Sequence, residues 1–389
     1  MPSRKAIAIV LCLLAMLHGV IGWLILPALP VALWLKWLGG VWLLLSFLLI
    51  PTGLLASVIK RQPLSDRLAW AGMLAMGMFS SLLMLTLLRE IVLLVMPWFG
   101  LNIAGIAAIT AAAVPLLAAA ATVIGFINAR RLAKVVKVDV PIKQLPAGLH
   151  GFTIAQISDI HVGPTIKRGY LNAIVERVNG LRADVVAITG DLVDGSVQRL
   201  APHTAPLADL KARHGAYFVT GNHEYYSNAD AWIAEVRRLG LTVLMNEHVI
   251  LQHQGASMLL AGVTDYGAHH FDEAHRSDPQ LAMAGMVDSG KNHVETANTI
   301  GMKLLLAHQP RSAAAAADAG FDLQLSGHTH GGQFFPWNLF VPLQQPYTAG
   351  LNKLRDLWVY TSRGTGYWGP PKRLWAPSEI TLLRLIPAD

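Results

Sequence analysis

The sequence predicts two physically different parts: an all-α part of about four membrane-spanning helices over residues 1–128, and an α/β part over residues 150–389. Residues 1–128 contain only nine charged side chains, whereas most acidic residues and histidines follow them. Four apolar runs in the first part reach the length of about 20 residues that crosses a bilayer. In the second part, short apolar runs typical of strands alternate with helical patterns. Residues 129–149 are predicted to form a basic linker and an entry strand.

Composition limits the class of protein. The mean hydropathy is +0.43 and only 14% of the residues are charged, which is too apolar for an ordinary soluble protein of this length. The single cysteine, Cys12, excludes an intrachain disulfide and a thiolate metal site. The net charge of +7 suggests nucleic acid, but several of the basic residues flank apolar runs, where they set topology. Since no basic, aromatic-lined groove is evident, we expect no nucleic-acid partner.

The four spans are predicted at residues 6–27, 38–59, 69–89 and 104–127. The first run follows Arg4 and Lys5 like a secretory signal. Its apolar stretch is longer than the usual 7–15 residues of such a signal, and three more runs follow it. We therefore predict a multi-pass anchor whose partner is the lipid bilayer.

The basic residues of the connections predict the orientation of the anchor. They gather before the first span, between the second and third, and after the fourth: Arg4, Lys5, Lys60, Arg61, Arg67, Arg130, Arg131, Lys134 and Lys137. The two alternate connections carry only Lys36. With four spans, every basic cluster lies on one side, so both termini and the α/β part are expected in the cytoplasm.

Arg89 and Glu90 interrupt a long apolar run and allow two interpretations. In the first, the third span ends near Leu88 and the following apolar residues lie at the membrane interface. In the second, the two charges form a buried pair with a function. We favour the first, because a charged pair near the end of a span is easily solvated. A fifth crossing here would invert the topology of everything that follows.

In the α/β part, predicted strands repeatedly end in loops rich in Asp, Asn and His. The strands at 152–158, 183–189, 216–220, 303–307 and 323–325 are followed by these residues: Asp159, His161, Asp191, Asp194, Asn222, His223, His308, His328 and His330. Loops at strand ends can converge on one point. Carboxylates, imidazoles and an amide oxygen without thiolates suit Mn²⁺, Fe²⁺ or Zn²⁺. A pair of such ions needs a bridging carboxylate and open positions, so the pattern predicts a two-metal site.

The motifs that carry these residues are Ser158-Asp159-Ile160-His161, Gly190-Asp191-Leu192-Val193-Asp194, Gly221-Asn222-His223-Glu224, His308 and Gly327-His328-Thr329-His330. Together they resemble the calcineurin-like metallophosphoesterase superfamily. The stretch LQLSGHTHGGQ at 323–333 and the Arg-Gly-Thr-Gly-Tyr-Trp-Gly-Pro-Pro stretch at 363–371 resemble its membrane-associated bacterial branch. The resemblance covers residues 135–386. It implies a two-sheet β-sandwich flanked by helices, with metals at one edge, in a bacterial inner (cytoplasmic) membrane.

Position by position, the resemblance implies a dinuclear centre with a bridging hydroxide. The first ion would be bound by Asp159, His161, Asp191 and His330, and the second by Asp191, Asn222, His308 and His328. His223 would give a proton to the leaving oxygen and Asp194 would orient its ring. An imidazole oriented by a carboxylate is a competent acid at neutral pH.

The sequence supports a binding role less strongly for several further polar residues. His269, His270, His275 and His293 would form a third metal site or belong to a solvated loop, and we favour the loop. Asp265 follows a predicted strand and is a candidate for contact with substrate. Arg363 and Lys372 flank the Gly/Pro/aromatic stretch and would contact a phosphate or support a turn.

Apolar residues, most of them aromatic, are frequent in the same loops: Phe334, Phe335, Pro336, Trp337, Trp368 and Trp375. Core packing explains some of them, while a wall for an acyl chain or a rim on the bilayer would explain the rest. We therefore predict a metal-dependent phosphoesterase acting on a small-molecule or lipid phosphoester. The candidates include a phospholipid and a nucleotide-linked lipid such as a UDP-diacylglucosamine. The alternative is a membrane-anchored, metal-binding regulatory protein without turnover.

Overall fold

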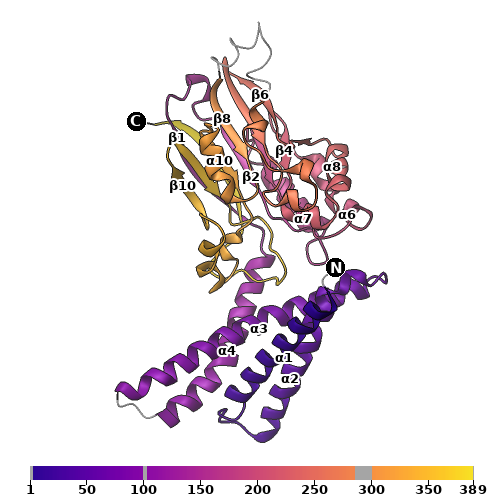
Figure 1. Ribbon diagram of the computed structural model, residues 1–389, viewed down its shortest axis with the longest axis vertical. Helices are drawn as coiled ribbons and strands as arrows, with labels where there is room; N and C mark the ends of the chain where they lie inside the picture. Colours follow the sequence, from indigo (N-terminus) through magenta and orange to yellow (C-terminus); the bar gives the residue numbers. More distant parts are fainter. Residues whose placement is uncertain (1–2, 100–102, 285–299, 389) are drawn as a thin grey trace. The chain divides into compact units, whose positions relative to one another are not determined.

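The computed structural model describes residues 3–99, 103–284 and 300–388 (Figure 1). The chain forms two compact units. The helical unit comprises Met1–Ile127 and Gly369–Lys372, and the α/β unit comprises Asn128–Trp368 and Arg373–Asp389.

Four long helices make up the helical unit: α1 (Arg4–Ile25), α2 (Leu33–Leu54), α3 (Leu64–Val95) and α4 (Ile103–Arg130). Among the described residues, these are the four helices long and apolar enough to cross a membrane. The expected all-α part of about four helices is therefore confirmed. The helix α2 begins at Leu33, before the predicted start of the second span at residue 38, and includes Lys36. Lys36 donates to the carbonyl of Pro27.

The helix that contains the predicted third span extends beyond the predicted span end near Leu88. The helix α3 continues to Val95, and Arg89 is buried in it. The guanidinium of Arg89 pairs with Glu90 and donates to the carbonyls of Leu24 (3.4 Å) and Ala107 (3.1 Å). Since α1 and α4 supply these acceptors, the charge stays within the bundle rather than at a solvated helix end.

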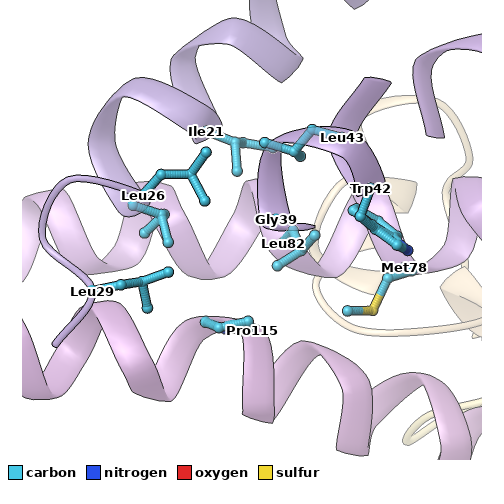
Figure 2. A pocket seen from close by; sticks show the side chains of 10 residues that line it. Ile21, Leu26, Leu29, Gly39, Trp42, Leu43, Met78, Leu82 and Pro115 are labelled. Carbon is cyan, nitrogen blue, oxygen red and sulfur yellow. The ribbon is translucent and has the colours of Figure 1, made fainter. Parts of the chain in front are cut away.

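The helical unit also has a partly open pocket of about 220 Å³ (Figure 2). Its lining is almost wholly apolar and comes from all four helices and the α1–α2 connection: Ile21, Ile25, Leu26, Leu29, Gly39, Trp42, Leu43, Met78, Leu82 and Pro115. No Asp, Glu, His, Lys or Arg belongs to this lining, so the pocket lacks the side chains that phosphoester chemistry needs.

Close packing of α2 on α3 depends on two glycines. A Cβ on Gly72 would lie 2.5 Å from the carbonyl oxygen of Leu49 and 2.6 Å from the Cα of Gly53. In a membrane, small residues of this kind let helix backbones approach, and dispersion contacts then hold the helices together.

The α/β unit contains two six-stranded mixed sheets. Strands of the first sheet follow the order β1 (Lys134–Ile142), β12 (Glu379–Pro387), β2 (Thr153–Ile157), β3 (Val185–Thr189), β4 (Ala216–Val219) and β5 (Thr242–Val243). The strands β2 to β5 are parallel, β12 is antiparallel to β2, and β1 is parallel to β12.

Strands of the second sheet follow the order β10 (Gly350–Leu354), β11 (Leu357–Thr361), β9 (Leu323–Ser326), β8 (Ile300–Leu306), β7 (Ala256–Gly262) and β6 (Glu247–His253). Here β7, β8, β9 and β11 are parallel, while β6 and β10 are antiparallel edge strands. The shorter helices are α5 (Arg168–Asn179), α6 (Val197–Thr204), α7 (Asn222–Tyr226), α8 (Ala229–Arg238) and α10 (Ala313–Asp318).

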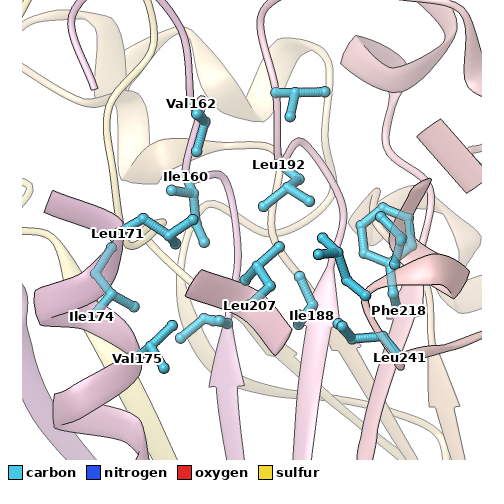
Figure 3. Packing of buried hydrophobic residues seen from close by; sticks show 14 of the residues in the cluster. Ile160, Val162, Leu171, Ile174, Val175, Ile188, Leu192, Leu207, Phe218 and Leu241 are labelled. Carbon is cyan, nitrogen blue, oxygen red and sulfur yellow. The ribbon is translucent and has the colours of Figure 1, made fainter. Parts of the chain in front are cut away.

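Three apolar layers hold the α/β unit together. One lies between the two sheets and includes Ile154, Leu260 and Leu304. A second packs the other face of the first sheet against helices, and its cluster includes Ile174 and Val175 of α5 and Ile188 of β3 (Figure 3). The third packs α10 on the outer face of the second sheet. The expected two-sheet sandwich flanked by helices is confirmed. Its parallel strands within each sheet bring their carboxyl ends to one edge.

We predict that Gly72→Ala destabilises the helical unit by about 1–3 kcal/mol, because the new methyl group has no room against α2. Gly19→Ala is the matched control, since a Cβ at Gly19 meets nothing within 4 Å. Thermal denaturation of the detergent-solubilised full chain measures both variants. Equal melting temperatures for the two would contradict the predicted contact.

Candidate metal centre

The predicted strand-end residues meet where parallel strands of both sheets end. In the first sheet, Asp159, Asp191 and Asn222 follow β2, β3 and β4. In the second sheet, His308 follows β8, and the loop with His328 and His330 follows β9. Asp159 and His308 are almost completely buried. The geometry therefore brings together side chains that are up to 171 positions apart in the chain, from Asp159 to His330.

Left-handed backbone conformations orient these side chains toward one another. Five of the seven predicted ligands have φ between +51° and +70°: Asp159, His161, Asp191, His328 and His330. A non-glycine residue in this region costs roughly 1–3 kcal/mol and persists where the surroundings dictate it. The strain is concentrated at the candidate centre, as is common at functional sites.

Glycines leave room for the ligand side chains. A Cβ on Gly327 would lie 2.1 Å from Oδ2 of Asp159, and a Cβ on Gly221 would lie 2.3 Å from Oδ1 of Asp191. Neither position can hold a larger residue without moving a carboxylate. The glycines of these two motifs are thus required by close approach.

One group of ligand atoms comprises Asp159, His161 and His330. The Nε2 atoms of His161 and His330 are 3.0 Å apart, and Nε2 of His330 is 3.4 Å from Oδ1 of Asp159. Two nitrogens bound to one ion at about 2.1 Å lie about 3 Å apart. The spacing therefore fits a single cation between these side chains.

A second group comprises Asp191, His308 and His328. Nε2 of His308 lies 3.2 Å from Oδ2 of Asp191 and 3.2 Å from Nδ1 of His328. The same Oδ2 atom is 3.9 Å from Nε2 of His161, so Asp191 reaches both groups. Within the described structure, the buried Oδ1 of Asn222 has no hydrogen-bond partner. An orphaned amide oxygen beside these side chains fits a missing cation ligand.

Hydrogen bonds on the far side of two imidazoles set their tautomers. Nδ1 of His308 lies 2.7 Å from the carbonyl of Thr189, and Nδ1 of His161 lies 3.0 Å from Oδ1 of Asp194. Each Nδ1 therefore carries the proton, which leaves Nε2 with a lone pair facing the other ligands. Metal-binding histidines ordinarily have such a partner on the remote nitrogen.

Asp194 also orients His223. Its Oδ1 lies 2.6 Å from Nδ1 of His223, while Nε2 of His223 is 4.0 Å from Oδ2 of Asp191. Burial by itself lowers the pKa of His223, but Asp191 and Asp194 outweigh this effect and raise the pKa to about 9. The His223 side chain is 14% exposed, so it faces a reactant more openly than the buried ligands do.

Sequence reasoning gave no role to Glu224, although it is part of a quoted motif. Its carboxylate is fully buried and accepts backbone N–H bonds from Gly221 (2.7 Å), Asp191 (3.0 Å) and Leu192 (2.8 Å). Burial, followed by the nearby Asp191 carboxylate, raises the pKa of Glu224 to about 8, whereas the N–H donors favour its ionised form. Glu224 thus ties the loop after β3 to the loop after β4.

Sequence reasoning also gave no role to Arg373, which lies next to Lys372. The Arg373 guanidinium is buried and donates to the carbonyls of His330 (2.9 Å), Arg363 (2.7 Å) and Ala376 (3.2 Å). Its Nη2 lies 3.0 Å from Nδ1 of His330. A buried cation bonded to several carbonyls fixes the ligand loop. Hydrophobic patterning gives no signal for it.

The two candidate substrate contacts have structural partners. Asp265 is fully buried and accepts from Gly267 (2.7 Å) and Gln309 (2.9 Å). Arg363 is 35% exposed and pairs with the buried Glu379 at 2.8 Å. Both substrate roles stay predictions, and Arg363 alone of the two has exposed surface for one. Lys372 belongs to the helical unit, where it donates to the carbonyl of Gly77 at 2.9 Å, so the geometry does not support a phosphate contact.

Among the described residues, His269, His270 and His275 belong to none of the groups that could hold a metal ion. The rings of His269 and His270 stack at 4.0 Å, while His275 contacts the hydroxyl of Tyr225. His293 lies outside the described residues. Aromatic side chains do border the centre: Tyr226 and Trp368 lie 5.2 Å and 5.9 Å from the His223 ring and are largely exposed.

We predict that Glu224→Gln lowers stability by about 1–3 kcal/mol, because an amide NH₂ group would face backbone N–H donors. Metal content should fall with it, since the two loops carry Asp191 and Asn222. Glu176→Gln on the exposed face of α5 is the control. Thermal unfolding and elemental analysis of the purified full chain measure the effects. A Glu224→Gln protein as stable as the control would show that Glu224 does not hold the two loops together.

The comparisons with known proteins agree with this geometry. The model of the Calcineurin-like phosphoesterase family matches residues 152–332. A protein of Danio rerio named "Transmembrane protein with metallophosphoesterase domain" is 38% identical over 274 residues, covering 68% of this chain and 60% of that protein. An "Uncharacterized metallophosphoesterase" of Helicobacter pylori is 39% identical over 239 residues, covering 61% of this chain and 60% of that protein. The chain thus spans 60% of the length of these two relatives.

A third relative, an "Uncharacterized metallophosphoesterase" of Aquifex aeolicus, is 30% identical over 254 residues, which cover 65% of this chain and 91% of that protein. The narrower expectation of a bacterial branch has no support, since the relatives include animal proteins as well as bacterial ones. The superfamily is confirmed by the family model, the relatives and the fold. The chain belongs to the calcineurin-like metallophosphoesterases.

Proposed function

We propose that this chain is a membrane-anchored phosphoester hydrolase that works with two divalent metal ions. The observation that carries the proposal is the sharing of Asp191 between two ligand groups, with His223 beside them on a more open face. Family membership supports the reaction class, and the four apolar helices support the membrane anchor.

The donor set fits two cations. Asp159, His161 and His330 would hold one and Asn222, His308 and His328 the other, with Asp191 shared. Carboxylate, imidazole and amide donors without thiolates suit Mn, Fe or Zn. Such ions, when bound, lower the pKa of a shared water and stabilise charge on phosphoryl oxygens.

His223 handles the proton on the leaving-group side. Asp194 holds Nδ1, so Nε2 is the atom that faces a reactant. An imidazolium in this position donates a proton to the departing oxygen, and Asp194 stabilises the positive ring. Because Asp194 also bonds His161, the same carboxylate orients the acid and one metal ligand.

The substrate is proposed to be a lipid phosphoester. Tyr226 and Trp368 place two exposed aromatic rings around His223, where a leaving group departs. Apolar rings beside the acid favour a reactant with an apolar or aromatic portion over a small hydrophilic phosphate. A phospholipid and a nucleotide-linked lipid such as a UDP-diacylglucosamine both meet this description.

The α/β unit is proposed to lie in the cytoplasm, on the inner membrane of a bacterium. Support comes from the basic residues of the connections. Lys60 and Arg61 follow α2, and Arg130 and Arg131 follow α4, on the same side as the amino terminus if there are four spans.

We predict that a cysteine-reactive, membrane-impermeant reagent leaves a cysteine at Ser257 unlabelled in intact cells. Ser257 is partly exposed on the α/β unit, and Cys12 is first replaced by alanine. The reagent should label the same cysteine after the cells are opened. Labelling in intact cells would place the unit outside and overturn the orientation.

We predict that the full chain hydrolyses a chromogenic phosphodiester with Mn²⁺ and that His223→Ala lowers the rate by about 10²–10⁴, the usual effect of losing a positioned acid. Metal content should be unchanged, because Nε2 of His223 is absent from the two ligand groups. Asp191→Ala and Asn222→Ala should instead lose metal.

Initial rates and elemental analysis of the same preparations give both readouts. Loss of metal in His223→Ala would overturn the role assigned to this residue. Absence of turnover with every divalent ion would favour a metal-binding regulatory protein. If turnover is found, mass spectrometry of native membrane lipids, before and after incubation with the enzyme, identifies the substrate.

A further inference from the structure

Exposed apolar side chains concentrate on one part of the α/β unit. Of the twelve large apolar side chains that are exposed in its described residues, six lie in residues 335–343 and at Trp375. We call this surface the apolar rim; its exposed members are Phe335, Trp337, Leu339, Phe340, Leu343 and Trp375. Leu343 is 80% exposed and Trp375 is 77% exposed. Soluble surfaces rarely gather such residues without a partner.

The apolar rim has a defined structure. Two short helical turns, Trp337–Leu339 and Val341–Leu343, satisfy much of its own backbone. The Phe335 and Trp375 rings pack at 5.1 Å, and the Trp337 and Phe340 rings pack at 5.8 Å. Short turns that use local hydrogen bonds can present apolar side chains outward without leaving backbone groups unpaired.

The rim is joined closely to the metal-ligand loop. Gly332 follows His330 by two residues, and a Cβ on it would lie 2.2 Å from the Cα of Asn338. Gln333 exchanges two hydrogen bonds of 2.8 Å with the backbone of Trp368, the residue beside His223. The rim, the ligand loop and the border of the candidate centre are thus one connected structure.

Charge around the rim suits a membrane surface. No Asp or Glu occurs between Asp322 and Asp356, a stretch that includes the whole 335–343 segment. Arg311 is exposed and donates to the backbone of Gln344 at the end of the rim. Phe, Trp and Leu side chains with a nearby cation and no carboxylate are typical of surfaces that enter an anionic lipid interface.

We propose that the apolar rim inserts into the interfacial layer of the lipid bilayer that holds the four apolar helices. Chain connectivity favours this partner over a soluble protein. Only residues 131–133 join α4 to β1, and such a connector spans at most about 10 Å. The α/β unit therefore stays at the membrane, where a bilayer is present at all times.

Insertion gives the candidate centre a source of substrate. The loop that continues from His328 and His330 into the rim would stand at headgroup depth. A lipid phosphoester then needs little transfer into water to reach the ligand groups. This consequence rests on the proposed function, whereas the insertion itself does not.

A spin label tests the insertion directly. Cys12 is replaced by alanine in the full chain, and a label is attached at Leu339→Cys in phospholipid nanodiscs. Ile250→Cys is the matched control, since Ile250 is an exposed apolar residue on the edge strand β6. We expect collisions with oxygen to exceed those with a water-soluble nickel complex at Leu339, and the reverse at Ile250. Aqueous accessibility at both positions overturns the proposal.

A kinetic comparison tests the consequence. Phe340→Asp should lower turnover of a lipid phosphoester in vesicles about tenfold or more, because a carboxylate replaces an aromatic side chain that enters the lipid interface. Turnover of a water-soluble chromogenic phosphodiester should stay within about twofold, since Phe340 contributes no ligand. Equal loss on both substrates means that the rim supports the centre rather than the membrane contact, which overturns this step. If neither substrate is turned over, the proposed function fails and the spin-label result still decides the insertion.

Discussion

Two buried carboxylates, Asp159 and Asp191, share a small volume with the imidazoles of His161, His308 and His330. Taking such charges out of water is costly unless cations or donors compensate them. Hydrogen bonds from the surrounding structure compensate part of this cost. Backbone N–H groups of His223 and His328 bond the two carboxylates, and the remote imidazole nitrogens are committed to acceptors. Divalent cations would supply the remaining positive charge, so the loops are arranged for a state that contains them.

The convergence of the candidate ligand residues could be predicted because each lies in a loop that follows an apolar strand, and the polar residue types at those positions have no packing role. Their convergence needed only the rule that parallel strands end at one edge. Glu224 and Arg373 could not be found in this way, since both act on backbone groups brought close by the fold. Arg373, for example, bonds the carbonyl of His330, 43 positions earlier in the chain. Backbone groups are present at every position, so the sequence does not reveal which of them a side chain will bond.

In the helical unit, too, some features could be predicted from the sequence and others could not. Length and apolarity were enough to predict four spans, because the bilayer thickness sets both. The helix ends were less predictable, as α2 includes Lys36 and α3 continues past Arg89. In each case a backbone carbonyl accepts from the charged side chain, so a charge in the sequence did not mark the end of a helix. Such carbonyl acceptors depend on how helices pack, which hydropathy does not describe.

The pairing of β1 with β12 has a consequence for biosynthesis. The first strand of the α/β unit finds its hydrogen-bonding partner in residues 379–387, and β12 also separates β1 from β2. Until residues 379–387 are synthesised, β1 lacks its hydrogen-bonding partner, and β2 can pair with β3 but has one open edge. Open edges invite association with other chains. The first sheet can therefore be completed only after translation of this region, and a chain interrupted before residue 379 would expose two strand edges at once.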